Sequence, residues 1–362
     1  MTFPANLSVV TYTYNDAALA RGLLESVAGW TVRPREIVVV DDGSREPFRP
    51  PGTIPEARLL RLSPNQGATR AKQAGLDAAT SKFILSVDAD VRLSPDWAAK
   101  ALPYAAAPGT GMVSSPVLYD SGRDALSRYL ALVYGFRPAP GATGYIPGPV
   151  WLMRREVWHE LGGFSKYREP IGEDSYLCAR LRQAGRELVI ASGVTARQVR
   201  RLSRPAMVRR GFTWQGSHLR EQLAKGSPLG EVMGVFLFSV SKRLPDLIPV
   251  DPDFAYFELL YVAHGLLTLA GHGEPSLARD LFAALGDYLG AYPRLAGLLS
   301  ADLKSLEHTP AETGGRAGTC ANLIATLANI FDPVLLRRLE DGGLAAITDE
   351  KTPGADFSFY ME

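Results

Sequence analysis

The residues best suited to chemistry are carboxylates that follow apolar segments. Asp41 and Asp42 come directly after the apolar run at 37–40, and Asp88 and Asp90 close the segment FILSVDAD. In open α/β sheets, ligands bind beyond the carboxyl ends of the parallel strands. Two acidic strand ends on neighbouring strands therefore predict one acidic crevice. The alternative for Asp41 and Asp42 is an ordinary polar turn, because Asp, Gly and Ser are common turn residues.

The D-x-D pair formed by Asp88 and Asp90 is a candidate metal site. On a continuing strand, residues i and i+2 face the same side, so the two carboxylates could converge. Hard divalent cations such as Mg²⁺ take oxygen ligands and usually combine one or two carboxylates with substrate phosphates. The alternative is a polar strand end that binds nothing. The second acidic strand end at 41–42 favours the metal hypothesis.

A third acidic pair, Glu173 and Asp174, begins the predicted helix of GEDSYLCARLRQAG. Acidic residues favour the first turn of a helix through the helix dipole, which is a purely structural explanation. The functional explanation is a general base, which requires a carboxylate held beside the proton that it removes. The pair by itself does not decide between them.

Strand and helix signals alternate through the first half of the chain, which predicts parallel crossover units in a doubly wound sheet. Strands are expected at 7–14, 37–40, 58–62, 83–90 and 112–119, and helices at 15–30, 67–80, 127–135 and directly after Glu173. Strand signals nearly vanish after about Arg204. Helices are then expected at 229–242, 254–271, 275–290, 319–331 and 333–341. We predict an α/β catalytic domain at 1–210 and a helical C-terminal region at 211–362.

Composition excludes several classes of protein. The 362 residues are 46% hydrophobic and 21% charged, as in a globular chain, and 39 Lys and Arg against 38 Asp and Glu give no general attraction to nucleic acid. The two cysteines lie far apart and suggest neither a disulfide framework nor a metal site. No secretory signal and no apolar run of about 20 residues is evident. We expect a cytoplasmic protein without a transmembrane segment, and peripheral membrane contact is left open.

Six motifs follow one another within residues 7–205. They are LSVVTYTYND, EIVVVDDGS, NQGATRAKQAG, ILSVDADVRLSPDW, MRREVWHELGGFSKY and GEDSYLCARLRQAG. In this order they resemble the family 2 glycosyltransferases, which have the GT-A nucleotide-sugar fold. The third motif departs from the family pattern, since Lys72 and Gln73 stand where Arg and Asn are usual. The resemblance implies an inverting enzyme that uses a nucleotide-diphosphate sugar as donor.

The resemblance also assigns a group of residues to the donor. The residues implied to bind the nucleotide or its diphosphate are Thr11, Tyr14, Asp41, Asp42, Arg70, Lys72 and Asp88. The paired aspartates would accept hydrogen bonds from a base N–H and from ribose hydroxyls. Which of the two contacts the base is left open, and UDP is the favoured nucleotide.

For the reaction itself, the resemblance implies a divalent cation, Mn²⁺ or Mg²⁺, held by Asp90 with Asp88. This cation would neutralise the charge that develops on the departing nucleoside diphosphate. Asp174 would take the proton of the acceptor hydroxyl as that oxygen attacks the anomeric carbon from the opposite face. Glu173 is the alternative base.

A basic segment follows the motifs, because residues 188–220 contain seven Arg and no acidic residue. A solvated basic face is one explanation, and binding of a diphosphate or an anionic acceptor is the other. The candidates for phosphate or acceptor contact are Arg197, Gln198, Arg201, His218 and the aromatic residue Trp151. Tyr145, in the Gly/Pro-rich loop at 137–150, is a candidate for stacking on a sugar. Gln198 stands where the family often carries His. The segment QVRRL resembles the Q-x-x-R-W motif of processive polysaccharide synthases without its Trp, so we expect a single addition.

The sequence thus predicts sugar transfer to a hydroxyl of a glycan, protein or lipid-linked acceptor. The C-terminal helices could cover the acceptor, form an oligomer or dock a partner. Nucleotidyl transfer is an alternative, but it predicts a glycine-rich loop after the first strand, and TYTYNDAALA has no glycine. A degenerate, non-catalytic sugar-binding or scaffold module is the other alternative. It predicts lost carboxylates, whereas Asp42, Asp88, Asp90 and Asp174 are all present.

Overall fold

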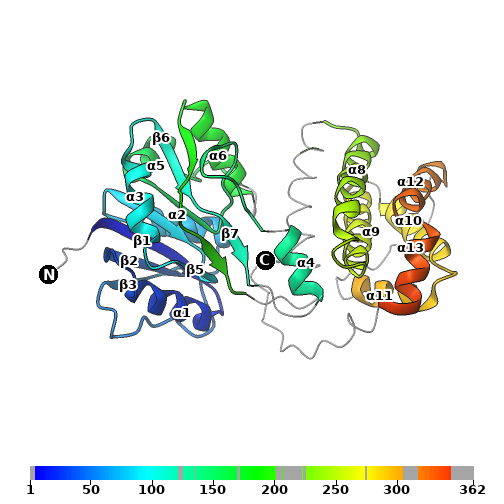
Figure 1. Ribbon diagram of the computed structural model, residues 1–362, viewed down its shortest axis with the longest axis horizontal. Coiled ribbons are helices and arrows are strands. Elements are labelled where there is room, and N and C mark those ends of the chain that lie inside the picture. Colours follow the sequence, from blue (N-terminus) through cyan, green and yellow to red (C-terminus); the bar gives the residue numbers. More distant parts are fainter. Residues whose placement is uncertain are drawn as a thin grey trace. The chain divides into compact units, whose positions relative to one another are not determined.

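The computed structural model describes residues 5–120, 125–133, 135–168, 172–200, 206, 222, 226–273, 275–304 and 317–343 (Figure 1). The chain separates into two compact units. Within the described residues, the first unit falls in the ranges up to 121 and 130–201, and the second in 122–129 and 202–355.

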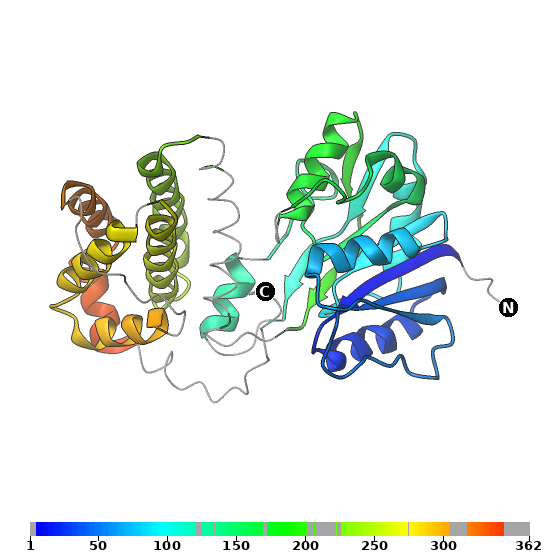
Figure 2. The ribbon, with the colours of Figure 1, turned by 180° about the vertical axis from the view of Figure 1, so that it is seen from behind.

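The first unit is built on a large sheet (Figures 1 and 2). The strand order in this sheet is β3-β2-β1-β4-β9-β6-β10-β8. Its strands are β1 (Ala5–Thr13), β2 (Pro34–Asp41), β3 (Ala57–Arg61), β4 (Phe83–Val87), β6 (Thr110–Ser114), β8 (Gly141–Thr143), β9 (Val150–Arg154) and β10 (Glu187–Ile190). All run in one direction except β8 and β9, which are antiparallel to their neighbours. The predicted α/β class with a mostly parallel sheet is confirmed.

Helices cover both faces of this sheet, which explains why its strands are apolar runs. Leu7 and Val9 of β1 belong to a core with α1 (Ala17–Ala28) and α3 (Trp97–Ala106). Val10 belongs to a second core, whose helices are α2 (Ala68–Ala78), α5 (Arg155–Leu161) and α6 (Glu173–Gln183). Successive strand residues alternate between the two faces. Because β1 pairs in parallel with both β2 and β4, the loops at the carboxyl ends of these three strands lie along one edge of the sheet.

A second, three-stranded sheet lies beside that edge and corrects one prediction. It joins β5 (Val91–Leu93), β11 (Ala196–Gln198) and β7 (Val117–Tyr119), with Gln198 opposite Val91. The strand expected at 83–90 ends at Val87, and the Val91 N–H donates to the Asp88 carbonyl at 2.9 Å. Asp88 and Asp90 therefore lie in a tight turn and not on a continuing strand. The strand pattern concealed this turn because apolar residues flank it on both sides.

Trp151 requires another correction. It lies on β9, a strand that was not predicted, and its side chain is 1% exposed. Its ring stacks on Trp158 with the ring centroids 6.0 Å apart. No face of the indole remains for a sugar, so Trp151 is a core residue. The expected strand at 112–119 is likewise divided into β6 and β7, around Ser115 and Pro116.

The second unit is helical, as predicted. Its helices are α8 (Leu229–Leu247), α9 (Phe254–Gly273), α10 (Pro275–Tyr288), α11 (Pro293–Lys304), α12 (Ala317–Ile330), α13 (Pro333–Arg338) and a π-helical turn at Leu339–Gly343. The first residues of α4 (Ala125–Val133) also belong to this unit. The prediction did not include α11.

Within this unit α9 packs against α8 and α10, and α12 contacts the same two helices. Arg243 on α8 pairs through two hydrogen bonds with the fully buried Glu258 on α9, which also accepts one from Tyr129. The negative charge of Glu258, which lies in the apolar sequence of α9, is thus neutralised by Arg243 inside the helical unit. Among the described helices, none has both the length and the apolar character that crossing a bilayer requires.

Close packing of α2 on the sheet gives a stability prediction. A Cβ at Gly75 would lie 2.5 Å from a methyl of Val10 and 2.8 Å from a methyl of Val40. Overpacking costs about 1–3 kcal/mol, against about 0.5–1 kcal/mol that Ala gains over Gly in a helix. We expect Gly75→Ala to lower the free energy of unfolding by about 1–2 kcal/mol, measured by urea denaturation with tryptophan fluorescence.

The control is Gly29→Ala, because Gly29 has an ordinary φ of −88° and a Cβ there would meet nothing closer than 3.5 Å. Its stability should change little. Equal stability of the two variants would contradict the close approach of α2.

Candidate active site

Lys72 is the centre of a group of charges at the carboxyl edge of the sheet. Its side chain leaves α2 and is 3% exposed. The ammonium lies 2.8 Å from Glu173 Oε1, 3.2 Å from Asp88 Oδ1 and 3.3 Å from the carbonyl oxygen of Gly148, and 5.5 Å from the centre of the Tyr12 ring. The structure thereby joins the D-x-D turn to the acidic pair of α6. It also gives Lys72, which departs from the family pattern, a defined position.

The two carboxylates that begin α6 differ in charge environment. Burial alone would raise the pKa of Glu173, but the charge and hydrogen bond of Lys72 bring this pKa below its usual value. Burial raises the pKa of Asp174, and the neighbouring charge of Glu173 raises it further. A pair of carboxylates whose pKa values are pushed apart is a common arrangement in acid–base catalysis.

Asp174 is oriented by the loop that precedes β9. Its Oδ2 accepts a hydrogen bond from the Tyr145 hydroxyl at 2.6 Å and one from the Gly148 N–H at 3.0 Å. A Cβ on Gly148 would lie 3.2 Å from both Glu173 Oε1 and Lys72 Nζ. The close approach of the backbone at Gly148 is what lets this loop contact all three charged groups. Burial and the charge of Asp174 raise the pKa of Tyr145, so the phenol stays a donor.

Asp88 and Asp90 are neutralised by different residues. Burial raises the pKa of Asp88 to about 6, although the charge of Lys72 opposes this shift, and the nearby Asp90 adds to it. Asp90 is 5% exposed, and its Oδ2 accepts from Gln198 Nε2 at 3.1 Å and from Arg200 Nε at 2.7 Å. Arg200 also pairs with Asp16 at 2.6 Å. The D-x-D turn is thus contacted by Lys72 at Asp88 and by Gln198 and Arg200 at Asp90.

Asp41 and Asp42 are both fully buried and bind the backbone of their own loops. Asp41 accepts from the N–H groups of Ser44 and Phe48 and from the guanidinium of Arg61. Asp42 accepts from the N–H groups of Gln66 and Gly67, both at 2.9 Å.

The two aspartates also differ in charge environment. Burial raises the pKa of Asp42 to about 6, whereas Asp41 is paired with a cation. Asp42 accepts two hydrogen bonds and Asp41 three. This distinguishes two residues that the sequence left equivalent.

Buried polar atoms without a hydrogen-bond partner gather at this same edge. Among the described residues they include Thr11 Oγ1, Thr13 Oγ1, Asn15 Nδ2 and Asn65 Nδ2. Buried polar groups are normally satisfied, so such a group indicates an unfilled position for a polar ligand. Thr11 was predicted to contact the donor. The predicted contact Tyr14 lies half-buried in the turn after β1.

Other predicted residues are not brought into the group. Arg70 is two positions before Lys72 on α2, so it leaves the helix in another direction, and it takes no part in the ion pairs of Lys72. Arg197 is largely exposed and lies 3.9 Å from Asp120. Arg201 and His218 lie outside the described residues.

The sequence did not assign Gly148, Asp16 or Arg200 to the site, and it considered Tyr145 only for stacking on a sugar. The signals present were the Gly/Pro-rich loop at 137–150 and the arginine cluster. Neither signal identifies the residue that contacts a carboxylate. The contact of Arg200 with Asp90 depends on the pairing of β11 with β5, which brings the two residues together.

A divalent metal ion is implied by the resemblance, and the residues present fit it in their chemistry. Asp88 and Asp90 supply hard carboxylate oxygens from a single turn, and Mg²⁺ or Mn²⁺ needs only one or two carboxylates when substrate phosphates complete its shell. In the described part of the chain, no group of three or more His, Cys, Asp or Glu side chains has the geometry of a metal site. The two carboxylates are therefore suited to a metal ion whose remaining ligands include phosphate oxygens of a bound substrate.

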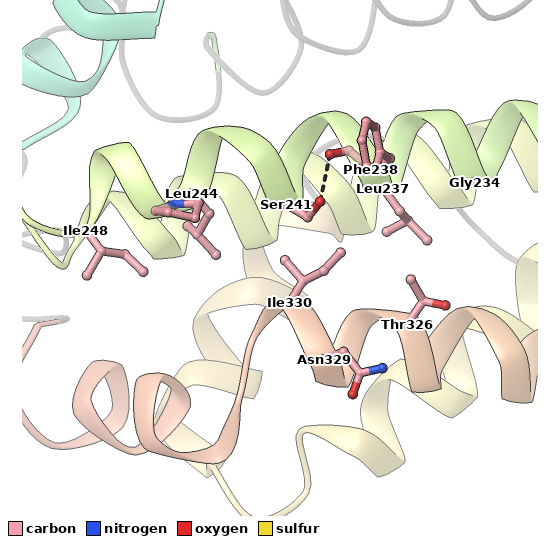
Figure 3. A pocket seen from close by; sticks show the side chains of 10 residues that line it. Gly234, Leu237, Phe238, Ser241, Leu244, Ile248, Thr326, Asn329 and Ile330 are labelled. Carbon is pink, nitrogen blue, oxygen red and sulfur yellow. Dashed lines mark hydrogen bonds between the residues drawn. The ribbon is translucent and has the colours of Figure 1, made fainter.

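The second unit contains a separate cavity of about 510 Å³ between α8 and α12 (Figure 3). Leu237, Phe238 and Leu244 line one side of it, and Thr326 and Asn329 line the other. None of the predicted site residues that the structure describes borders it. The cavity is distinct from the charged group at the sheet edge.

Comparison with known proteins supports the interpretation of the motifs. Residues 8–162 match the model of glycosyl transferase family 2. This part of the chain is a family 2 glycosyltransferase domain. The match covers the strand ends with Asp41, Asp42, Asp88 and Asp90, together with Lys72. The resemblance inferred from the sequence motifs is confirmed.

Two relatives that match part of this chain are named as glycosyltransferases. The pre-mycofactocin glycosyltransferase of Mycobacterium tuberculosis is 29% identical over 195 residues, which are 51% of this chain and 40% of the relative. The glycosyltransferase YwdF of Bacillus subtilis is 31% identical over 25% of this chain and 34% of its own. This chain therefore spans less than half the length of the curated relatives that it matches.

Among solved structures, the mannosyltransferase PcManGT from Pyrobaculum calidifontis, in complex with GDP-Man and Mn²⁺, is similar with a TM-score of 0.46 and 20% identity. The similarity covers 92% of this chain and 89% of that one.

The position of Lys72 in the family 2 domain gives a prediction. Lys72→Met would leave Glu173 and Asp88 buried without their cation, and breaking a buried ion pair costs about 3–5 kcal/mol. Both carboxyls would then bind protons at higher pH. Because protonation removes the unpaired charges, the loss of unfolding free energy should be larger at pH 8 than at pH 5.

Urea denaturation at the two pH values measures this effect. The control is Lys100→Met. Lys100 is 47% exposed, and its contacts in the described residues are an ion pair with Asp96 and a hydrogen bond to the Gly193 carbonyl, so the effect should stay within about 0.5 kcal/mol. A loss in Lys72→Met that is the same at both pH values would contradict the ion pairs described.

Proposed function

We propose that this protein is a glycosyltransferase that moves a sugar from a nucleotide-diphosphate sugar to an acceptor hydroxyl with inversion. One observation carries the proposal beyond family membership. At the start of α6, two adjacent carboxylates have opposite pKa shifts, and one of them, Glu173, is joined through Lys72 to Asp88 in the D-x-D turn of the family 2 domain. A base and a donor site are thus part of one connected group.

The nucleotide is proposed to bind along the ends of β1 and β2. The buried and unpartnered Thr11 Oγ1 supports this, because a base or ribose group would satisfy it. We assign the nucleotide contact to Asp42 and give Asp41 the role of fixing its loop. Asp41 already accepts three hydrogen bonds, whereas Asp42 accepts two.

The diphosphate is proposed to lie over the D-x-D turn, where Asp88 and Asp90 would hold Mn²⁺ or Mg²⁺. When bound there, the cation neutralises charge on the leaving nucleoside diphosphate. Lys72 keeps Asp88 in place and keeps Glu173 ionised.

Asp174 is proposed as the base, and Glu173 as the residue that positions Lys72. The raised pKa of Asp174 matches what a base needs, while the lowered pKa of Glu173 makes it a weak one. The Tyr145 hydroxyl and the Gly148 N–H fix Oδ2, which leaves Oδ1 to receive the acceptor proton. Oδ1 accepts one local hydrogen bond, from the N–H of Ser175.

The remaining parts of the proposal concern the acceptor, the location in the cell and the donor nucleotide. We propose a single addition to a hydroxyl of a glycan, protein or lipid-linked acceptor in the cytoplasm. UDP is the favoured nucleotide. Acceptor, oligomer or partner binding is assigned to the helical unit. The alternative is a non-catalytic sugar-binding module with the same fold.

The base assignment predicts the behaviour of Asp174→Asn. The amide retains an oxygen that can accept from Tyr145 and Gly148, so the loop should keep its position, but the amide cannot take a proton. We expect kcat to fall by about 10²–10⁴-fold while the Kd for the donor changes less than twofold, measured by sugar-transfer assay and calorimetry.

The matched control is Asp96→Asn, an equal change of charge at an exposed position, which should leave both quantities unchanged. Equal losses of donor binding and of transfer in Asp174→Asn would place the base elsewhere.

The donor is identified by thermal shift with UDP-, GDP-, dTDP- and CDP-sugars, each with and without Mn²⁺. A ligand present at 100 times its Kd adds about 2.7 kcal/mol of stability, which is a readable change in Tm. We expect one nucleotide to shift Tm, and only in the presence of the metal. No shift with any donor would favour the non-catalytic module, and a shift without metal would remove the metal from the proposal.

A further inference from the structure

Arg200 connects the acidic ends of two neighbouring strands. Its Nε donates to Asp90 Oδ2 at 2.7 Å, and its Nη1 lies 2.6 Å from Asp16 Oδ2. Asp90 lies in the turn after β4, and Asp16 lies in the turn after β1, which pairs with β4 in parallel. The Arg200 side chain is 14% exposed and that of Asp90 is 7% exposed. The guanidinium is therefore a largely buried counter-ion.

The same oxygen of Asp90 also receives the amide of Gln198 at 3.1 Å. Gln198 is 2% exposed, and the Val199 N–H donates to the Asp90 carbonyl at 2.8 Å, so the backbone of β11 is fixed to this turn. A carboxylate oxygen has about two lone-pair positions. With two N–H donors on Oδ2, neither position on that oxygen is open to a metal ion.

A divalent cation that binds Asp90 through Oδ2 must remove at least one of these donors, and one that binds through Oδ1, which accepts neither of these bonds, would lie close to the guanidinium of Arg200. Gln198 is neutral and held by a β-strand, whereas Arg200 carries a positive charge that repels the incoming ion at short range. Arg200 is the donor whose departure relieves this repulsion. Its second partner, Asp16, offers the guanidinium a place to remain when Asp90 is taken.

We propose that Arg200 is a built-in competitor of the divalent cation at Asp90. This inference rests on the proposed function, since it concerns the metal assigned to the D-x-D turn. Arg200 neutralises Asp90 while no metal is bound and keeps only its ion pair with Asp16 when the ion is bound. The affinity of the nucleotide-free protein for Mn²⁺ or Mg²⁺ is kept low by this exchange.

The test is direct Mn²⁺ binding to the nucleotide-free protein at low ionic strength, measured from the electron paramagnetic resonance signal of free Mn²⁺. Arg200→Gln, which removes the competing charge, should bind Mn²⁺ at least about tenfold more tightly than the unaltered protein. Arg200→Lys keeps a charge but cannot bridge both aspartates, and it should bind about threefold more tightly.

The matched control is Arg186→Gln. Arg186 directly precedes β10, at the opposite end of that strand from the carboxyl edge, and pairs with Glu160 at 2.8 Å. This change removes the same charge away from the turn, so Mn²⁺ affinity should change less than twofold. A rise in this control equal to that in Arg200→Gln would reduce the effect to net charge and overturn the proposal.

Mn²⁺ affinity in Arg200→Gln that equals the unaltered protein, including no detectable binding in either, also overturns the proposal. If Arg200→Gln does not fold, the comparison of Arg200→Lys with the unaltered protein decides, and equal affinities overturn it. Failure of the proposed function has a different signature. No nucleotide-diphosphate sugar would then shift Tm for any of these proteins, with or without Mn²⁺, whatever their Mn²⁺ affinities.

Discussion

The site depends on one buried ammonium. Lys72 Nζ has three N–H donors, and its three polar contacts come from Asp88 after β4, from Glu173 on α6 and from the carbonyl of Gly148. Without that cation, two carboxylates would be buried without compensation, which a protein interior does not tolerate. With it, a strand end, a helix start and a loop are fixed to one another. The charge that permits burial of these acids also separates the pKa values of Glu173 and Asp174.

The sheet makes this grouping possible because parallel strands deliver their carboxyl ends to one edge. Asp16, Asp42 and Asp88 follow β1, β2 and β4, which are neighbours in the sheet. Burial on both faces excludes water from beneath this edge, so each charge must find a partner in a neighbouring loop. Arg61, Lys72 and Arg200 supply such partners from β3, α2 and the end of β11. The edge is therefore organised by ion pairs between segments that are distant in sequence.

The sequence was sufficient for the α/β class, for the helical second unit and for the acidic strand ends, because apolar periodicity and strand–helix alternation are local signals. It was not sufficient to predict which side chains contact one another. The turn at Asp88–Asp90 was hidden by the apolar residues on both sides. Strand β9 was missed because Trp151 was interpreted as an acceptor contact, whereas it is a buried strand residue. Asp41 and Asp42 each accept two backbone N–H groups, and the difference between them follows from Arg61, which pairs with Asp41. Such contacts are set by tertiary packing and leave no periodic pattern.

The carboxylates of the site outnumber the cations that pair with them, and this imbalance would oppose the binding of a diphosphate. Five carboxylates (Asp16, Asp88, Asp90, Glu173 and Asp174) are connected by direct contact or by chain adjacency, and the cations with ion pairs to them in the described residues are Lys72 and Arg200. If all are ionised, a net negative charge remains. A diphosphate would add to that charge at low dielectric, where like charges repel strongly. In the proposed function, additional positive charge enters with the donor as a divalent ion, and the two carboxylates of the D-x-D turn are suited to receive it.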